Sequence, residues 1–267
     1  MTYSNSLKKT IMKQLKFVTA IILSAALFTA CNSNNASNTS STTGSNLSAS
    51  TNGDDYYYEL TTNSSGKDIS INELTKMFVS SKGDMRMEMN VNNSMNGNKL
   101  SAPIIMIAHA GKPNESIEID DSAKTYTVNH IDSSDTNTDE KINSTATKVG
   151  DEKVMGFNCV HARIISKKTM GSFYSSVDTI DLWKSNDVPQ QPSVKTLMNR
   201  FESGKGNSMY STETADQLKQ MGCDGFTVQM VMASKDVAMK LQLNKVERKD
   251  LPSSLFEVPT GYKEIKE

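Results

Sequence analysis

Cys31 is the residue whose surroundings point most directly to chemistry. It follows an uncharged apolar run, Phe17 to Ala30, and four lysines precede that run. A basic start, about a dozen apolar residues and a small residue before the cut are typical of a secretory signal peptide. The run has 14 residues, whereas a spanning helix needs about 20, so an uncleaved anchor is the weaker alternative.

A cysteine directly after the cut predicts covalent attachment of lipid. Cleavage would leave a diacylated Cys31 at a new, acylated N-terminus, with Met1 or Met12 as the start of translation. We therefore expect residues 1–30 to be a lipoprotein signal peptide. The acyl chains would hold the protein on a membrane, each buried methylene contributing about 0.8 kcal/mol. The expected location is the bacterial cell envelope, as an outer-membrane lipoprotein facing the periplasm or the cell surface.

Groupings of residues typical of enzymes are missing from the sequence. His109, His130 and His161 stand apart without the spacing of metal ligands, and no Cys-x-x-Cys occurs. Asp178 and Asp181 lie three apart in an expected strand, so they should face opposite sides and cannot form a carboxylate pair. We expect no catalytic residue, no metal site and no cofactor, and hence no enzyme.

Cys159 and Cys223 remain once Cys31 is assigned to lipid. Two cysteines in an exported chain can form one disulfide. The alternative is two buried free thiols, and both stay open because sequence does not show proximity.

The charge balance excludes some partners. The chain has 29 basic and 30 acidic residues, and residues 1–30 hold four of the lysines and no acid. Without them the net charge is near −5, which argues against nucleic acid and against electrostatic docking on anionic lipid. Membrane attachment should therefore come from the acyl chains alone, and the sequence names no protein partner.

Composition divides the chain into a tether and one domain. Residues 32–53 contain one large apolar residue, Leu47, and cannot bury enough surface to fold. We expect residues 31–53 to be a lipidated cysteine followed by a flexible Asn/Ser/Thr tether. Residues 54–267 suffice for a single core, with a mobile loop near residues 131–148 that shows no periodicity.

Alternation of apolar and polar residues dominates this domain and predicts strands. The expected segments are 56–62, 75–81, 85–91, 103–110, 116–120, 124–130, 159–167, 177–184, 226–232 and 237–243. The last two should form an antiparallel hairpin with one buried face. Pro252 and Pro259 bracket three apolar residues near the end, and we expect that segment to cover a sheet edge.

Helical signals are few and lie close together. Ser193 to Phe201 has apolar residues at helical spacing. A second helix should run from a cap at Ser211 or Thr212 to Met221, where Gly222 ends it. The fold class is therefore mainly β (α+β), an antiparallel sheet with one or two helices across one concave face.

Several pieces of the chain resemble a known family. They are Gly83–Glu88, Gly156–Cys159, Asp181–Trp183 and, most specifically, Leu251–Tyr262. The chain resembles an uncharacterised family of exported bacterial proteins, many of them lipoproteins, related in fold to the lipoprotein carriers LolA and LolB. The resemblance implies a strongly curved antiparallel sheet or half-barrel, covered by helices around an apolar cavity that in the carriers holds acyl chains.

Methionine is unusually frequent, with 16 in the chain, many of them on expected strand faces. Its flexible thioether suits an adaptable apolar surface, so these residues could line a pocket for an apolar or lipid ligand. The alternative is ordinary core packing in a structural or interaction protein without a ligand. The residues of this expected pocket are Met85, Met87, Met89, Met230, Met232, Met239 and Leu241.

Overall fold

The structure is a computed structural model that describes residues 54–67, 69–95, 98–130, 140–170, 174–191, 209–235 and 237–266. The expected signal peptide, Cys31 and the tether lie outside the described residues. The expected helix at Ser193–Phe201 and the loop residues 131–139 also lie outside them. All of these stay predictions.

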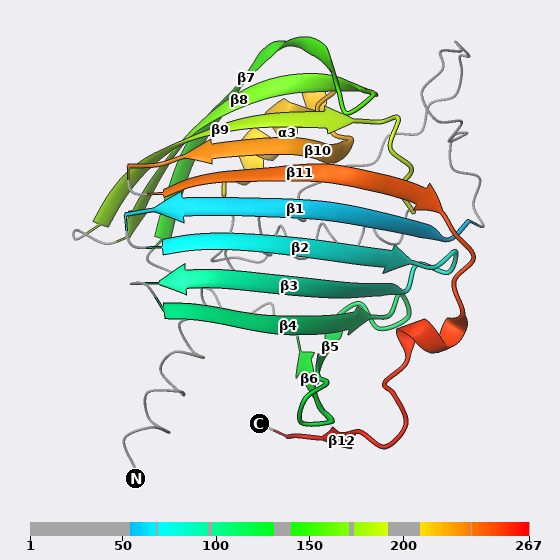
Figure 1. The fold of residues 1–267 in the computed structure, drawn as a ribbon. Coiled ribbons are helices and arrows are strands. Elements are labelled where there is room, and N and C mark those ends of the chain that lie inside the picture. The colour runs from blue at the N-terminus through cyan, green and yellow to red at the C-terminus, as the bar shows by residue number, and fades with distance from the viewer. Residues whose placement is uncertain are drawn as a thin grey trace.

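One twelve-stranded sheet makes up most of the described chain (Figure 1). The strands are β1 (Tyr56–Gly66), β2 (Ile69–Val79), β3 (Met85–Met95), β4 (Asn98–Ala108), β5 (Glu115–Asp120), β6 (Thr125–His130), β7 (Glu140–Val154), β8 (Phe157–Met170), β9 (Tyr174–Ser185), β10 (Phe226–Ala233), β11 (Val237–Arg248) and β12 (Lys263–Glu264). Their order across the sheet is β12-β6-β5-β4-β3-β2-β1-β11-β10-β9-β8-β7. Neighbours are antiparallel except β12 with β6. Two meanders therefore meet in the middle, at β1 and β11.

Apolar and polar residues that alternate in the sequence alternate between buried and exposed positions in the strands. Along β1, Tyr56, Tyr58 and Leu60 are buried, whereas Asn63 and Ser65 are exposed. Every expected strand is present, and several run further than expected. The expected hairpin is also confirmed, because β10 and β11 pair antiparallel.

The loop expected near residues 131–148 is wrong for its second half. Glu140–Val154 forms β7, which stands at the edge of the sheet and pairs with β8. Its side chains on the buried side include the small Ser144 and Ala146, and its other side is exposed. An edge strand of this kind lacks the large apolar residues whose alternation reveals a strand.

The second expected helix is confirmed as α3 (Thr212–Gln220), the single α-helix among the described residues. The Ser211 side chain accepts a hydrogen bond from the backbone N–H of Thr214 and so caps its start. Gly222, at φ +75°, supplies the left-handed residue that ends it. In the part of the chain that is described, no helix is long and apolar enough to cross a membrane.

The helix attaches to the β7 edge of the sheet. The backbone N–H of Ala146 donates to Gln217 Oε1 at 2.9 Å, and the hydroxyls of Ser144 and Thr214 lie 2.7 Å apart. Leu218 of α3 is buried in the same core cluster as the sheet residues. This contact places α3 on the inner side of the sheet and gives β7 a partner beyond β8.

The segment between the two prolines was expected to cover an edge of the sheet, but its helix contacts β3, which is not an edge strand. The 3-10 helix η1 (Ser253–Phe256) buries Phe256 and contacts β3. Leu255 O accepts a hydrogen bond from Arg86 Nη1 at 3.3 Å. Beyond it, β12 pairs in parallel with β6, so the chain protects its own edge strand.

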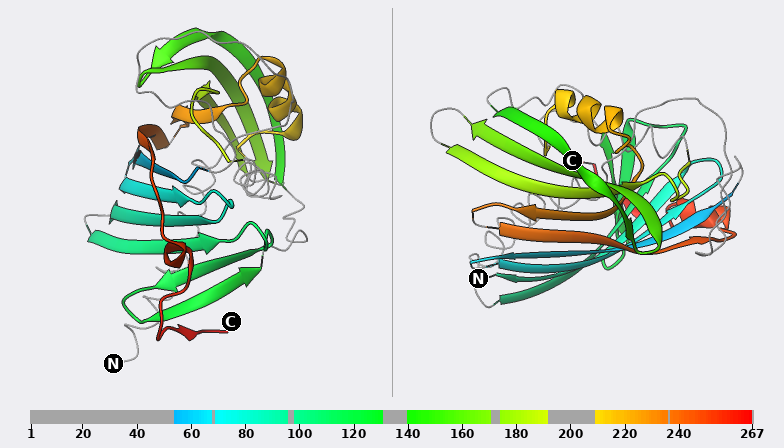
Figure 2. Two further views of the ribbon diagram at one scale, coloured as in Figure 1. Left: turned by 90° about the vertical axis from the view of Figure 1, so that its right-hand side faces the viewer. Right: turned by 90° about the horizontal axis from the view of Figure 1, so that it is seen from above.

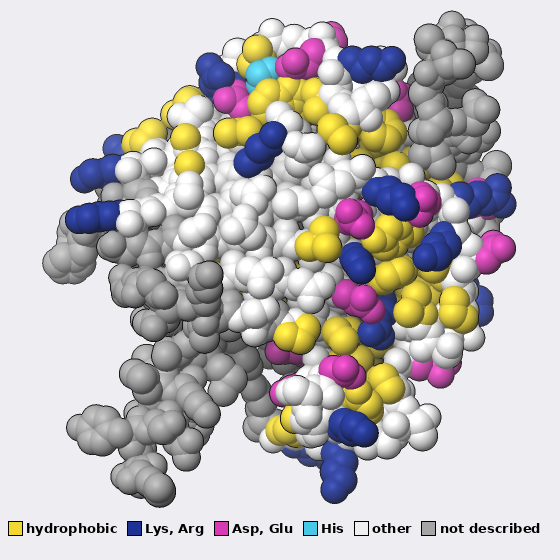
Figure 3. Space-filling view, viewed as in Figure 1, with side chains coloured by type: hydrophobic (Ala, Val, Ile, Leu, Met, Phe, Trp, Pro, Cys, Tyr) yellow, Lys and Arg dark blue, Asp and Glu magenta, His cyan; other side chains and the backbone are white. Residues whose placement is uncertain are grey.

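The sheet is open and strongly curved (Figure 2). The main hydrophobic cluster lies on its inner face. On the outer face, seen in Figure 3, white atoms dominate the left of the middle, whereas hydrophobic and charged side chains gather toward the right and along the top. A mainly β fold on one large curved antiparallel sheet is thus confirmed. A half-barrel closed by helices stays an expectation, because α3 contacts mainly β7.

Candidate functional site

The residues expected to form an apolar pocket all lie on the inner face, in two groups. One group comes from β3, and the other comes from the β10–β11 hairpin, where Met230 is opposite Leu241 and Met232 is opposite Met239. Strands β1 and β2 separate the groups. Within the β3 group, Met89 belongs to a small second cluster, but Met106 packs against both clusters and joins them.

These side chains are packed closely. Six of the seven are between 0% and 4% exposed, and Met232 is half-buried. Such burial is what core packing requires, so the apolar pocket stays a prediction. A hollow of about 540 Å³ lies elsewhere, at the end of α3, and its lining is polar and charged. The lining residues are Asp216, Lys219, Gln220, Gly222 and Asp224.

The inner face changes character along the strands. In β1 it passes from Tyr56 and Tyr58 to Thr62 and Ser64, all of them buried. The polar end is at the arrowhead of β1 in Figure 1. Other strands contribute buried polar side chains toward the same end: Glu73 and Thr75 of β2, Asn93 of β3, Ser166 of β8 and Asp178 of β9. The inner face is therefore amphipathic along the strand direction.

Glu73 is the buried acid at the centre of this polar end. It is 2% exposed, and its Oε1 accepts a hydrogen bond from the Thr75 hydroxyl at 2.6 Å. Burial raises the pKa of Glu73 above its usual value, and the bond from Thr75 offsets this only in part. Burial also raises the pKa of Asp178, against the attraction of Lys168. Burial therefore opposes the ionisation of both acids.

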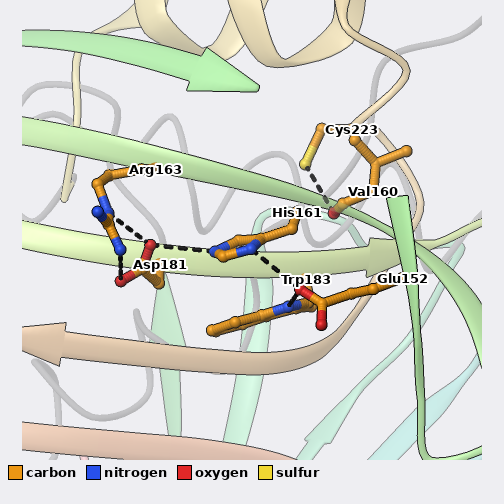
Figure 4. Close-up of polar contacts among 7 residues, drawn as sticks. All are labelled: Glu152, Val160, His161, Arg163, Asp181, Trp183 and Cys223. Atoms are coloured by element: carbon orange, nitrogen blue, oxygen red, sulfur yellow. Dashed lines mark hydrogen bonds and ion pairs between the residues drawn. The ribbon is translucent and has the colours of Figure 1, made fainter. Parts of the chain in front are cut away.

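A second polar group occupies the outer face of β8 and β9 (Figure 4). His161 lies between two acids, with Nδ1 3.0 Å from Glu152 Oε1 and Nε2 3.1 Å from Asp181 Oδ1. Arg163 donates from two nitrogens to Asp181, at 2.8 and 3.0 Å. The Trp183 indole donates to Glu152 Oε1 at 2.6 Å and stacks on the imidazole. We call these five residues the His161 cluster.

The bonding in the His161 cluster is structural. Partial burial would raise the pKa of Asp181, but hydrogen bonds from Arg163 and His161 outweigh it and the pKa is lowered. The cluster contains no Ser, Thr or Cys nucleophile, and no metal-binding group of His, Cys, Asp and Glu occurs among the described residues. Its side chains bind one another and tie β7, β8 and β9 together.

Sequence reasoning missed this cluster because it depends on register. Asp181 and Trp183 are two positions apart on β9 and so share one face. They lie opposite Arg163 and His161 of β8, respectively. A period-two pattern on both strands was visible, but the pairing was not. The expected separation of the two acids is confirmed, since Asp181 faces outward whereas Asp178 is buried on the inner face.

The other two histidines lie apart from this cluster. His109 follows β4, and its Nδ1 is 3.4 Å from Asp84 Oδ1. His130 ends β6 and is exposed. Both positions agree with the surface or structural role expected for them.

Cys159 and Cys223 are free thiols in the structure, so the disulfide, one of two alternatives, is not formed there. The Sγ of Cys159 is 3.6 Å from Phe157 O, and the Sγ of Cys223 is 3.7 Å from Val160 O. Both thiols belong to the main hydrophobic cluster. Burial raises the pKa of each to about 11, which makes them poor nucleophiles.

A family model described as "Domain of unknown function (DUF4412)" matches residues 62–262, most of the chain. The chain belongs to the DUF4412 family. The match begins within β1 and ends in the C-terminal segment, so it covers nearly the whole sheet. It confirms the uncharacterised family expected from the sequence. No curated protein matches the chain.

Solved structures similar to this DUF4412 chain have low identity to it. LprF from Mycobacterium bovis is 10% identical, with a TM-score of 0.35 over 79% of this chain and 90% of that one. The LolA superfamily protein NE2245 from Nitrosomonas europaea is 6% identical, with a TM-score of 0.32 over 76% of this chain and 90% of that one.

Proposed function

We propose that the protein is a membrane-anchored lipoprotein of the bacterial cell envelope that binds an apolar ligand or a lipidated partner along the inner face of its sheet. It performs no catalysis in this role. Cys31 would carry the acyl chains and residues 32–53 would give the domain reach above the bilayer. The observation that supports the binding role is the concentration of methionine on the inner face. These methionines are Met77, Met85, Met87, Met89, Met106, Met230, Met232 and Met239.

The chemistry of methionine suits a surface that must adapt to a guest. The side chain is unbranched, has three rotatable bonds and is polarisable, so it can repack around an alkyl chain at low cost. Burial of apolar surface contributes about 25 cal/mol per Å², whichever molecule supplies that surface. A guest can therefore replace contacts that the methionines make with one another.

The second candidate is a structural or protein-interaction lipoprotein with a solid core. The observation that favours it is the near-complete burial of the expected pocket residues, such as Met87 and Leu241. In that case the inner face has no exchangeable guest. The two candidates differ in one measurable property, the retention of an apolar ligand.

The binding role is tested with the full chain carrying Cys31→Ser, so that the covalent lipid does not interfere. Native mass spectrometry and a fluorescent fatty-acid probe should detect bound apolar ligand. Met89→Gln, on the buried face, should weaken probe binding about tenfold, which corresponds to roughly 1.4 kcal/mol. Met155→Gln, at the exposed β7–β8 turn, is the matched control and should leave binding unchanged. A folded chain that never retains ligand would support the solid-core alternative.

A further inference from the structure

Among the residues that the structure describes, three buried polar atoms on the inner face have no hydrogen-bond partner. They are Oε2 of Glu73 and both side-chain polar atoms, Nδ2 and Oδ1, of Asn93. Glu73 is 2% exposed and Asn93 is 4% exposed. Buried polar groups are nearly always paired, and each one left unpaired costs about 1–3 kcal/mol. Their presence together calls for a reason beyond packing.

The two residues are close enough to contact one small group. Glu73 is opposite Val91 in the β2–β3 ladder, and Ile71 is opposite Asn93. Glu73 and Asn93 are therefore diagonal neighbours on the same face, roughly 7–8 Å apart. A single polar group lying between them would reach the carboxyl oxygen and the amide together.

The unpaired atoms define what that group must be. Oε2 of Glu73 needs a donor if the acid is ionised, whereas Asn93 offers a donor nitrogen, Nδ2, and an acceptor oxygen, Oδ1. The inner-face positions flanking Glu73 are Thr62 on β1 and Val91 on β3, so no basic residue stands beside it there. An anionic group would meet an uncompensated buried acid, which is costly. Hydroxyl and amide groups, which both donate and accept, can partner all three atoms, whereas an ammonium group can partner the two oxygens.

Apolar side chains continue from this position along the same strand face. From Asn93 the inner face of β3 passes through Val91, Met89 and Met87 to Met85, all buried. These eight residue steps span about 27 Å at roughly 3.4 Å per residue. A long alkyl chain starting at Asn93 would therefore meet apolar surface along its length.

We propose that Glu73, Thr75 and Asn93 bind the head group of an amphiphilic ligand, a group that donates hydrogen bonds and carries no negative charge. The alkyl chain of the ligand lies over Val91 and the β3 methionines. This inference rests on the proposed function and adds a selectivity for the head group. A hydroxyl or amide head group would also give all three unpaired atoms a partner.

The test compares three probes with the same twelve-carbon chain on the full chain carrying Cys31→Ser. Dodecylamine carries an ammonium head, 1-monolauroylglycerol carries hydroxyls, and laurate carries a carboxylate. Calorimetry at pH 7 should show laurate binding at least tenfold more weakly than both other probes, a difference of about 1.4 kcal/mol. The stronger of the two favoured probes then tells whether the natural head group is cationic or neutral.

Two variants connect that preference to the site. Glu73→Gln removes the acid, so laurate should bind within about threefold of monolauroylglycerol, a gap of roughly 0.7 kcal/mol. Asn93→Leu should weaken monolauroylglycerol about tenfold while leaving the fold intact by circular dichroism. Glu88→Gln, which alternates with the inner-face residues of β3 and so lies on its outer side, is the matched control and should keep the full preference.

The outcomes separate this inference from the proposed function. Equal affinity for all three probes, or a preference that Glu73→Gln leaves unchanged, would overturn the head-group site while apolar binding stands. If no probe binds to the folded chain, both proposals fall.

Discussion

The imidazole of His161 lies nearly parallel to the indole of Trp183, with ring centroids 4.1 Å apart and planes 18° from parallel. Glu152 Oε1 lies within hydrogen-bond distance of both rings. The stack thus joins β8 and β9, while Glu152 adds β7 to the same contact. Because Trp183 is the sole tryptophan of the chain, its fluorescence reports on this joint.

His161→Ala should destabilise the protein and alter its tryptophan emission. The change removes a stacked ring and leaves two acids facing an empty position, so we expect a loss of about 1–3 kcal/mol in the free energy of unfolding. Urea denaturation followed by Trp183 fluorescence measures both effects. His109→Ala, which removes a half-exposed ring at 3.4 Å from Asp84, should cost less than about 0.5 kcal/mol. Equal effects of the two substitutions would contradict a structural role for the His161 cluster.

Glu73→Gln should stabilise the protein at pH 7 and lose that advantage in acid. Burial raises the pKa of folded Glu73, so the folded state holds this proton more tightly than the unfolded chain does. The stabilising contribution of the acid is therefore full below the unfolded pKa and is lost as pH rises through the folded pKa. The free energy of unfolding, measured from pH 4 to pH 7, should show the wild-type chain falling behind the variant as pH rises.

Glu257→Gln, at an exposed position, is the control for the loss of one acid from the chain. A constant difference between Glu73→Gln and the wild type across the range would mean that Glu73 does not titrate abnormally.

Gly225→Ala should be strongly destabilising. A Cβ at this position would overlap the backbone carbonyl of Ser185 and lie 2.6 Å from the backbone nitrogen of Asn186. Neither backbone can move without disturbing the end of β9, so we expect a loss of about 2–3 kcal/mol. Thermal unfolding compares it with Gly111→Ala, where nothing lies within 4 Å. If both variants melt together, the close approach at Gly225 is absent in solution.

Cys159 and Cys223 should react slowly with thiol reagents in the folded protein. With each pKa raised to about 11, only about one thiol in a thousand is ionised at pH 8, and both are buried. Mass spectrometry of the Cys31→Ser chain, labelled after unfolding without reductant, should find two modified thiols. An unlabelled mass lower by two hydrogens would show that the disulfide alternative holds in the exported protein.

Cys31→Ser should abolish incorporation of radioactive palmitate and release the protein from the membrane fraction. The reason is that the acyl chains, rather than surface charge, are expected to supply the attachment. Cys223→Ser is the matched control, because its thiol is buried in the core and should not affect lipid attachment. Membrane retention of an unlabelled Cys31→Ser chain would show that residues 17–30 anchor the protein uncut.

Local sequence signals predicted those elements whose own residues carry the pattern. Met85, Met87 and Met89 alternate with polar residues, and β3 lies there. Ser211 and Gly222 mark the two ends of α3. The pattern failed where burial is supplied by another element, as in β7, whose Ser144 packs against Thr214 of the helix.

The polar sites could not be predicted, because they depend on which strands are neighbours. Glu73 lies in the first half of β2, where Ile71, Glu73 and Thr75 do not form an apolar row, and so it escaped notice as an inner-face residue. His161 gained its acidic partners only through pairing of β8 with β9 and β7. The register between two strands cannot be seen in the sequence of either strand alone.

The central ladder also sets an order on folding. In the middle of the sheet, the Thr61 hydroxyl of β1 accepts a hydrogen bond from the Asn244 side chain of β11. The two residues are 183 positions apart in the chain. The hairpins β1–β2 and β3–β4 can form as soon as they are made, because their contacts are local. β1 must nevertheless wait, with one side unpaired, until almost the whole chain has been synthesised. During that interval the unpaired edge of β1 could pair with another chain, so a chaperone would be needed there. A chain whose synthesis stops early would keep this edge exposed and prone to aggregation.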